Sequence, residues 1–476
     1  HDYRAGVFYG VNHHSTTDEF LGQLDADRPV TAHLWSSNYD IDRPYQDVTH
    51  DLATLQLRTT GEWGSMSSTY AFQVNLRKEY EPVRGDNPLA QFDFTLRTHS
   101  IDTLYEHPTI NTSIGTLNGG VGLQSSFQEN VYKGLSLIPN YRSLSGGIFA
   151  YERLSMERLD IEAGARADAL SRAAYIPKRD YQAHIRRGTI NEANCEAIPD
   201  KSRCPADYTA ASFSVGTLVH VIPSRFDVKL DLSTASRFPN VDELYMLGWA
   251  PTFPVYANGN PNLGVETVWN ASLTSGVRHE AIEVEASVFG QFVDDYVYFS
   301  PEFTESGEPK FDINIRGAWP SWEFQPIDAV FYGLDGSINL APLAPVGLEA
   351  RGGLVRAEHV DTGHHLIGTP ADHLNLALIG RPPSVGPIHK IELRVTTEMV
   401  ASQSRVRTED DFAPPPPGYT LWGAGVDAEI GHRKPIRVGI EARNLLDQSY
   451  RDYSSLLRYY ANQPGRDIRF RMGMDF

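Results

Sequence analysis

The stretch Asp467-Ile468-Arg469-Phe470-Arg471-Met472-Gly473-Met474-Asp475-Phe476 decides how the rest of the chain is interpreted. Every second position from Ile468 to Phe476 is apolar, and charged residues or glycine lie between them. Because the side chains of a strand point alternately to its two faces, this pattern predicts a strand with one apolar and one polar face. Strands of soluble β-sandwiches show the same pattern, so the other segments of the chain have to distinguish the two classes.

Similar segments recur along all 476 residues. Short turns alternate with long loops between them, apart from a longer link at 106–118, and the long loops include 132–142, 169–206, 237–265, 300–325, 403–417 and 445–466. A barrel that crosses an outer membrane has short periplasmic turns and long outside loops. The chain therefore predicts an all-β, antiparallel transmembrane β-barrel of about 18 strands, with both chain ends on the periplasmic side. The predicted strands are 3–12, 47–60, 66–78, 90–105, 119–131, 143–154, 157–168, 207–221, 225–236, 266–278, 281–299, 326–340, 346–358, 371–381, 388–402, 418–430, 434–444 and 467–476.

Composition excludes several classes of function. The formal net charge of -18 makes the chain a poor binder of nucleic acid, because contacts to phosphates need basic patches. Apolar runs of about 18 residues, which a helical membrane protein needs, are absent. Neither a nucleophile elbow, nor a zinc-protease motif, nor a phosphate-binding loop occurs, so we expect no enzyme activity and no cofactor.

The two cysteines, Cys195 and Cys204, lie in a Pro- and charge-rich stretch within loop 169–206. A metal pair would come with further Cys or His residues at short spacing, and these are missing. The spacing favours a disulfide that staples an exposed loop in an oxidising compartment, and two unpaired loop thiols are the alternative.

Four stretches carry a family resemblance. They are Ser236 to Tyr245 with Gly259-Asn260-Pro261-Asn262-Leu263 and Glu266, then Asp294 to Tyr298, then Ala329 to Asp335, and finally Arg443 to Asp447 with the residues up to Phe476. In this order they resemble the barrel of TonB-dependent outer-membrane receptors over nearly the whole chain, and the likeness looks closest to the Bacteroidota branch.

The resemblance implies an active importer of a scarce substrate, such as an iron chelate (siderophore) or a related metal complex, in the outer membrane of a Gram-negative cell. Its expected partners are outer-membrane lipid and lipopolysaccharide, and TonB-ExbB-ExbD through an N-terminal plug. Two alternatives remain open: a non-transporting or passive barrel in an envelope assembly, and a glycan or peptide importer with a lipoprotein lid.

The chain departs from the family pattern in two respects. No segment resembles the plug or the TonB box, and family barrels have roughly 22 strands. We therefore expect residues 1–476 to be the C-terminal portion of the barrel, without the plug and the first four or so strands. Strands 3–12 and 467–476 should then pair with other polypeptide rather than with each other, because free sheet edges are costly in lipid.

Candidate ligand-binding residues lie in the predicted long loops. Trp249 and Tyr256 can stack on a chelate or sugar, and Arg405, Arg407, Arg451 and Arg458 can grip an anionic siderophore. Girdle packing is the alternative for the two aromatics, and neutralisation by Glu409, Asp410 and Asp411 is the alternative for Arg405 and Arg407. Weak metal-binding candidates are His13, His14, His364 and His365, for which solvated loop histidines are the alternative.

Overall fold

The computed structural model describes residues 45–80, 88–190, 195–250, 253–314, 317–341, 345–431, 434–459 and 462–474, together with positions 22, 41 and 43. Every predicted strand within these residues is present, whereas the predicted strand 3–12 lies outside them. The strands of the wall are β1 (Tyr45–Gly61), β2 (Gly64–Tyr80), β3 (Phe92–Glu106), β5 (Thr116–Gly134), β6 (Asn140–Ser155), β7 (Leu159–Pro177), β9 (Lys201–Ile222), β10 (Phe226–Arg237), β13 (Glu266–His279), β14 (Ile282–Pro301), β16 (Gly317–Leu340), β17 (Val346–His359), β18 (His373–Gly380), β19 (Ile388–Val400), β20 (Tyr419–Ile430), β21 (Ile436–Arg443) and β22 (Asp467–Met474).

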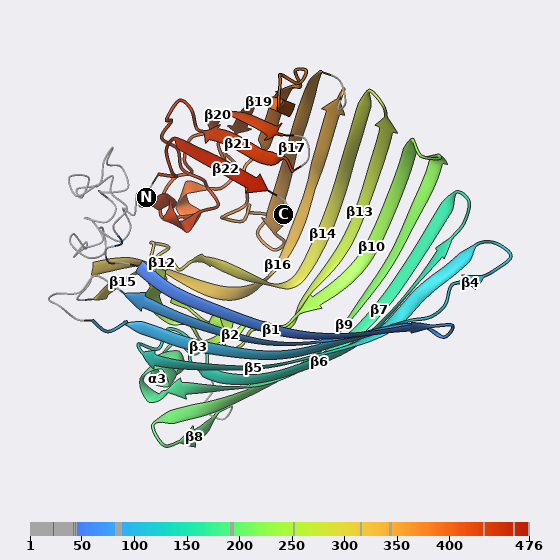
Figure 1. The fold of residues 1–476 in the computed structure, drawn as a ribbon. Helices are drawn as coiled ribbons and strands as arrows, with labels where there is room; N and C mark the ends of the chain where they lie inside the picture. Colours follow the sequence, from blue (N-terminus) through green and yellow to red (C-terminus); the bar gives the residue numbers. More distant parts are fainter. Residues whose placement is uncertain are drawn as a thin grey trace.

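These wall strands form one continuous sheet. Each is antiparallel to the wall strand that precedes it in the chain. The sheet curves around a central space, and short elements of the connections lie at its ends (Figure 1). These short elements are β4 (Ile110–Asn111), β8 (Glu196–Ile198), β11 (Leu247–Ala250), β12 (Phe253–Asn258), β15 (Phe311–Asn314) and the helices α3 (Lys178–Arg186) and α4 (Val241–Tyr245).

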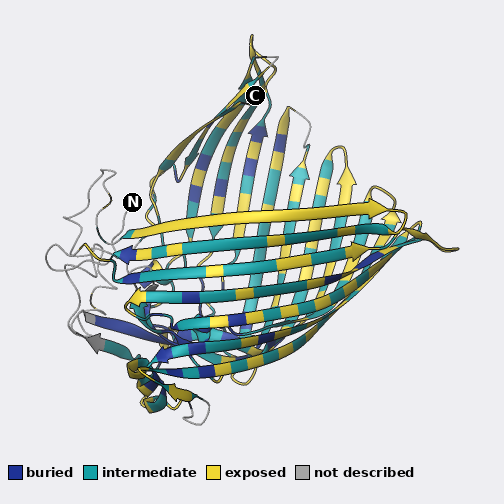
Figure 2. Ribbon diagram, turned by 60° about the horizontal axis from the view of Figure 1, so that its bottom comes forward, coloured by how far each residue is buried: buried dark blue, intermediate teal, exposed yellow. Residues whose placement is uncertain are grey.

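The outer face of the wall is apolar. Exposed and less exposed residues alternate along its strands (Figure 2). The register shows how the exposed apolar residues line up: Leu230 lies opposite Leu273, which lies opposite Val288, which in turn lies opposite Leu334. Their side chains are 42 to 46% exposed. Continuous exposed apolar surface of this kind is rare on proteins that meet only water, whereas a wall in lipid requires it.

The opposite face of the wall is polar. A recess of about 720 Å³ lies against strands β17 to β22, and Arg and carboxylate side chains line it in equal number. Arg394 of β19 and Glu349 of β17 are 2.9 Å apart, which shows how these charges are matched across the intervening strand β18. The wall therefore separates an apolar outside from a polar inside. The ten charged residues that line the recess are Arg351, Arg394, Arg443, Arg469, Arg471, Glu349, Glu398, Asp427, Glu441 and Asp467.

Three predicted loops are shorter than expected. Loop 169–206 is confined to 178–200, loop 300–325 to 302–316, and loop 132–142 to 135–139. The predictions were wrong here because backbone pairing continues beyond the part of each strand that alternates in polarity. Strand β16, for example, begins at 317 with aromatic residues and prolines on both faces and not with an alternating pattern.

The two outermost wall strands are β1 and β22. Within the described residues, β1 has a recorded pairing only with β2, and β22 only with β21. Strand β1 is exposed on both faces along almost its whole length. The expected pairing of strand 3–12 falls outside the described residues and stays a prediction.

A salt-bridge network shapes the long connection after β10. Arg237 donates hydrogen bonds to the carboxylates of Glu243, at 2.8 Å, and Glu266, at 3.0 Å. Asn240 caps α4 through a capping box with Glu243. The side chain of Asn260 accepts a hydrogen bond from the backbone N–H of Asn262, which forms the turn that leads into β13. These contacts join the residues of the first family-like stretch, from Ser236 to Glu266, into one structural unit.

Candidate functional site

The connections after β10, β14, β17, β19 and β21 meet the first part of β16 in one packed group at one end of the wall. We call it the loop cluster, and its buried members are Val255, Trp319, Trp322, Ile367, Val406, Phe412, Tyr453 and Tyr459. Trp249, Tyr256, Phe311 and further aromatics pack against these residues from outside. Segments that are more than 200 positions apart in the chain therefore form one surface, because each strand delivers its loop to the same end of the sheet.

The two predicted aromatic residues lie at the edge of the loop cluster. Trp249 of β11 stacks on Trp319, with ring centroids 4.3 Å apart and ring planes at 10°. Tyr256 of β12 is half-buried, and burial raises the pKa of its hydroxyl, which keeps it neutral. Both side chains are partly exposed while Trp319 is buried. The stack thus fixes a partly exposed indole against a buried one, and a fixed aromatic ring is suited to contact a flat ligand.

Arg458 lies inside the loop cluster and not on its surface. Its guanidinium is 2.7 Å from the carboxylate of Asp411 and 2.8 Å from the hydroxyl of Tyr459. It also lies over the rings of Tyr453 and Tyr459, at 4.9 and 4.4 Å. Because Asp411 follows β19 and Arg458 follows β21, this buried pair joins two loops.

Arg405 and Arg407 have separate partners. Arg405 donates to Asp372 at 2.8 Å, and Asp372 is also bound by Arg356. Arg407 pairs with Glu409 at 2.8 Å and donates to a ring nitrogen of His364 at 2.8 Å. The structure therefore shows the neutralised arrangement for Arg407, and it joins Arg405 to a carboxylate of a different loop.

The remaining predicted residues that the structure describes are spread over the end of the wall that carries the loop cluster, which we call the loop end. Arg451 donates to the side chain of Asn462 at 3.0 Å and to the backbone carbonyl of Arg458 at 2.9 Å. His365 is 3.8 Å from Glu358, and His13 and His14 lie outside the described residues. In the part of the chain that the structure describes, no group of three or more His, Cys, Asp or Glu side chains is placed to hold a metal ion.

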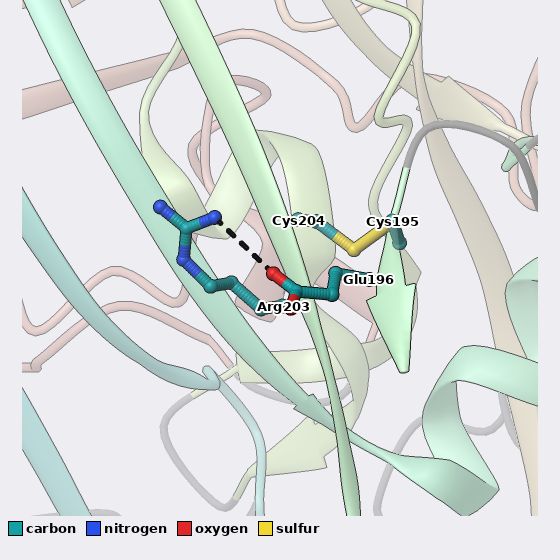
Figure 3. The surroundings of a disulfide bond; sticks show 4 residues. All are labelled: Cys195, Glu196, Arg203 and Cys204. Atoms are coloured by element: carbon teal, nitrogen blue, oxygen red, sulfur yellow. Dashed lines mark ion pairs between the residues drawn. A yellow bond between two sulfur atoms is a disulfide. The ribbon is translucent and has the colours of Figure 1, made fainter. Parts of the chain in front are cut away.

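The structure joins Cys195 and Cys204 by a disulfide (Figure 3). Cys195 precedes β8 and Cys204 belongs to β9, so the bond ties a short hairpin together. Beside it, Arg203 and Glu196 form an ion pair at 3.7 Å. The disulfide therefore holds the connection after β7, which contains α3, to wall strand β9.

Sequence reasoning missed a buried polar centre around Glu302. Its carboxylate accepts hydrogen bonds from Asn258, Ser321 and Arg187, at 3.2, 2.7 and 3.1 Å, and also from Lys310. Burial alone would raise the pKa of Glu302, but the hydrogen bonds and the two nearby cations outweigh it and lower that pKa. No local motif indicates this centre, because its members come from three connections and from strand β16.

Comparison with known proteins identifies the family. A family model for the β-barrel of TonB dependent receptor-like proteins matches residues 1–445. The chain belongs to this family. A search of curated protein sequences found no match. In the described residues, no helix is long and apolar enough to cross a membrane. Membership places the chain in a family of outer-membrane β-barrel receptors, which are transporters and not enzymes.

Solved structures of this family share the fold. The copper transporter OprC superposes with a TM-score of 0.65 at 14% identity, over 88% of this chain and 65% of that one. The FrpB iron transporter from Neisseria meningitidis superposes with a TM-score of 0.63 at 10% identity, over 90% of this chain and 63% of that one. BauA, the ferric preacinetobactin receptor from Acinetobacter baumannii, superposes with a TM-score of 0.62 at 13% identity, over 91% of this chain and 64% of that one. The chain thus spans less than two thirds of the length of these proteins.

Proposed function

We propose that this chain is the barrel of a TonB-dependent active importer, and that its substrate is a metal chelate such as a ferric siderophore. The observation that carries the proposal is the loop cluster, in which five connections form one aromatic surface at one end of the wall. A channel that only lets solutes diffuse has no need for such a joined surface, whereas a receptor has to hold a scarce solute before transport.

Family membership supports the energy coupling. In the full-length receptor the plug would connect the lumen to TonB-ExbB-ExbD, with both ends of the present chain on the periplasmic side and the loop cluster outside. The structural neighbours are named as a copper transporter, an iron transporter and a ferric preacinetobactin receptor, which favours a metal complex as substrate. The charge of the chelate is expected to be negative, because Arg405, Arg407 and Arg451 are at least partly exposed at this end, although carboxylates also contact Arg405 and Arg407.

Uptake by cells that produce the full-length protein tests the proposal. We expect labelled iron, supplied on a panel of anionic siderophores, to accumulate in cells with an intact TonB system and to stay outside in cells without it. Equal uptake in both strains would contradict active import and indicate a passive barrel. Uptake of labelled oligosaccharide or peptide in place of iron would show that the substrate class is wrong.

A pair of substitutions tests where the substrate binds. W249A combined with Y256A should weaken uptake about tenfold or more, because two aromatic contact surfaces are removed from the loop cluster. Heat-modifiable gel mobility should stay unchanged, since the wall strands are untouched. The matched control is W269A, which removes an indole that is 58% exposed on the outer face of β13. Unaltered uptake in the double variant would show that the substrate binds elsewhere on the receptor.

A further inference from the structure

A charged row crosses the lipid-facing surface of three neighbouring strands. Arg97 of β3 lies opposite Glu129 of β5, and Glu129 lies opposite Arg142 of β6. All three share the face that carries the exposed side chains of Ile101 and Leu123, which are 46 and 58% exposed. Charges on a lipid-facing surface are costly at the membrane centre and tolerated near its interfaces, so their height in the membrane matters.

The length of the apolar band gives that height. Along β5 the apolar residues of the outer face run from Leu117 through Val121 and Leu123 to Phe127. The ten residue-to-residue steps from Leu117 to Phe127, at about 3.3 Å each and tilted by roughly 45°, span about 23 Å. This is close to the apolar band of about 25 Å that outer-membrane barrels present to lipid. Glu129 is the next residue on this face toward the loop end, so the charged row lies at the level of the lipid headgroups.

The row has an excess of positive charge. The carboxylate of Glu129 is 2.7 Å from Arg142 and 3.6 Å from Arg97. Arg142 is 63% and Arg97 is 47% exposed, whereas Glu129 is 24% exposed. One carboxylate thus holds two guanidinium groups, and both arginine side chains stay about half exposed or more. Arginine donors in a fixed orientation are suited to phosphate.

The neighbouring residues on this face do not cancel the excess. Val74 of β2 lies opposite Arg97 and separates it from Asp51 of β1, and Ala173 of β7 lies opposite Arg142. At the next charged level toward the loop end, Asp93 of β3 lies between Lys78 of β2 and Lys133 of β5. The positive row is therefore confined to β3, β5 and β6 at this height.

We propose that Arg97 and Arg142 form a docking site for the phosphate group of a membrane lipid in the leaflet at the loop end. In the outer membrane of a Gram-negative cell this leaflet contains phosphorylated glycolipid. The site faces the membrane, on the opposite side of the wall from the lumen, and it does not depend on which substrate the receptor imports.

Binding to the detergent-solubilised full-length protein tests the proposal. The probe is a glycolipid of the lipid A type with two phosphates, and native mass spectrometry measures its affinity. We expect R97Q combined with R142Q to weaken binding about tenfold, since two cations near a charged lipid surface are lost. The single variant R142Q, which leaves the other arginine with Glu129, should weaken it about threefold. R278Q is the control: it removes a guanidinium of similar exposure, 60%, which pairs with Asp227 on the inner face.

Two further binding measurements identify the chemical group that the site recognises. The same lipid without its phosphates should bind the wild-type protein no better than the double variant binds the phosphorylated lipid. Inorganic pyrophosphate at equal concentration should not displace the phosphorylated lipid. Equal binding by wild-type and both arginine variants, or equal binding of the dephosphorylated lipid, would overturn the proposal. Full displacement by pyrophosphate would also overturn it, because the site would then bind a free anion. Heat-modifiable gel mobility shows that each variant has assembled.

Discussion

At the scale of single residues, the buried pair of Asp411 and Arg458 shows how the loop end is held. Their side chains are 0 and 3% exposed, and they connect the loops after β19 and β21. A buried ion pair adds little compared with a well-packed apolar pair, but removing one partner leaves an uncompensated charge. The pair is therefore a specific weak point of the loop cluster.

Asp411→Asn tests this role. The substitution should destabilise the packing of the two loops by about 3 to 5 kcal/mol, because Arg458 then stays buried without its counter-charge. Hydrogen exchange of residues 401–418 and 444–459 should become faster, while exchange in the wall strands stays slow. Glu409→Gln is the control, since Glu409 is 64% exposed and its loss should have little effect. Equal exchange in both variants would show that the pair does not hold the loops.

His184 of α3 is a second residue with a measurable consequence. Its side chain is fully buried, and this burial lowers its pKa from the ordinary 6.5 to about 4. The folded connection therefore holds the neutral imidazole, whereas the unfolded connection takes up a proton below about pH 6.5. This contribution to stability is present above pH 6.5 and is lost as the pH falls from 6.5 through 4.

We accordingly expect protection of α3 against hydrogen exchange, corrected for intrinsic rates, to fall roughly tenfold or more between about pH 7 and pH 4.5. His184→Phe should remove most of this dependence, because a phenyl ring fills the buried position and the titrating imidazole is lost. His279→Phe, at the exposed last residue of β13, should leave the dependence unchanged. A pH profile that is the same in wild-type protein and in the His184 variant would contradict the assignment.

At the scale of elements, the strands were predictable from sequence and the loop structure was not. A strand such as β5, with lipid outside and a polar lumen inside, has to alternate in polarity, so its presence shows in the sequence. Beyond the membrane this constraint ends, and the first part of β16 and the last part of β7 escaped prediction. The contacts of Glu302 and Arg458 join segments far apart in the chain, and no local pattern records such contacts.

The disulfide belongs to this scale because it holds one connection. Closing a loop of this size should stabilise the connection by roughly 2 to 3 kcal/mol in the chain-entropy model. Intact mass without reductant should show the chain two hydrogens lighter than its reduced form, and C195S with C204S should make residues 195–204 more sensitive to protease. Detection of two free thiols in the untreated protein would refute the disulfide.

At the scale of the whole molecule, one wall separates two environments and its loop end forms the receptor surface. The apolar rows of the outer face run from strand to strand through the register of the sheet, and the charges of the inner face are matched across strands. The proposed import activity and the proposed lipid site both depend on this arrangement. If the outer face did not meet lipid, neither proposal would stand.

The most direct test is the solvent environment along β5 in the full-length protein inserted in a bilayer. Single cysteines with spin labels at 123, 125 and 127 should be accessible to oxygen, which concentrates in lipid, and those at 124, 126 and 128 to a water-soluble nickel chelate. The label at 129 should be accessible to both, since it lies at the headgroup level. We predict this alternation with a period of two. Uniform accessibility to the nickel chelate along the whole series would contradict the account.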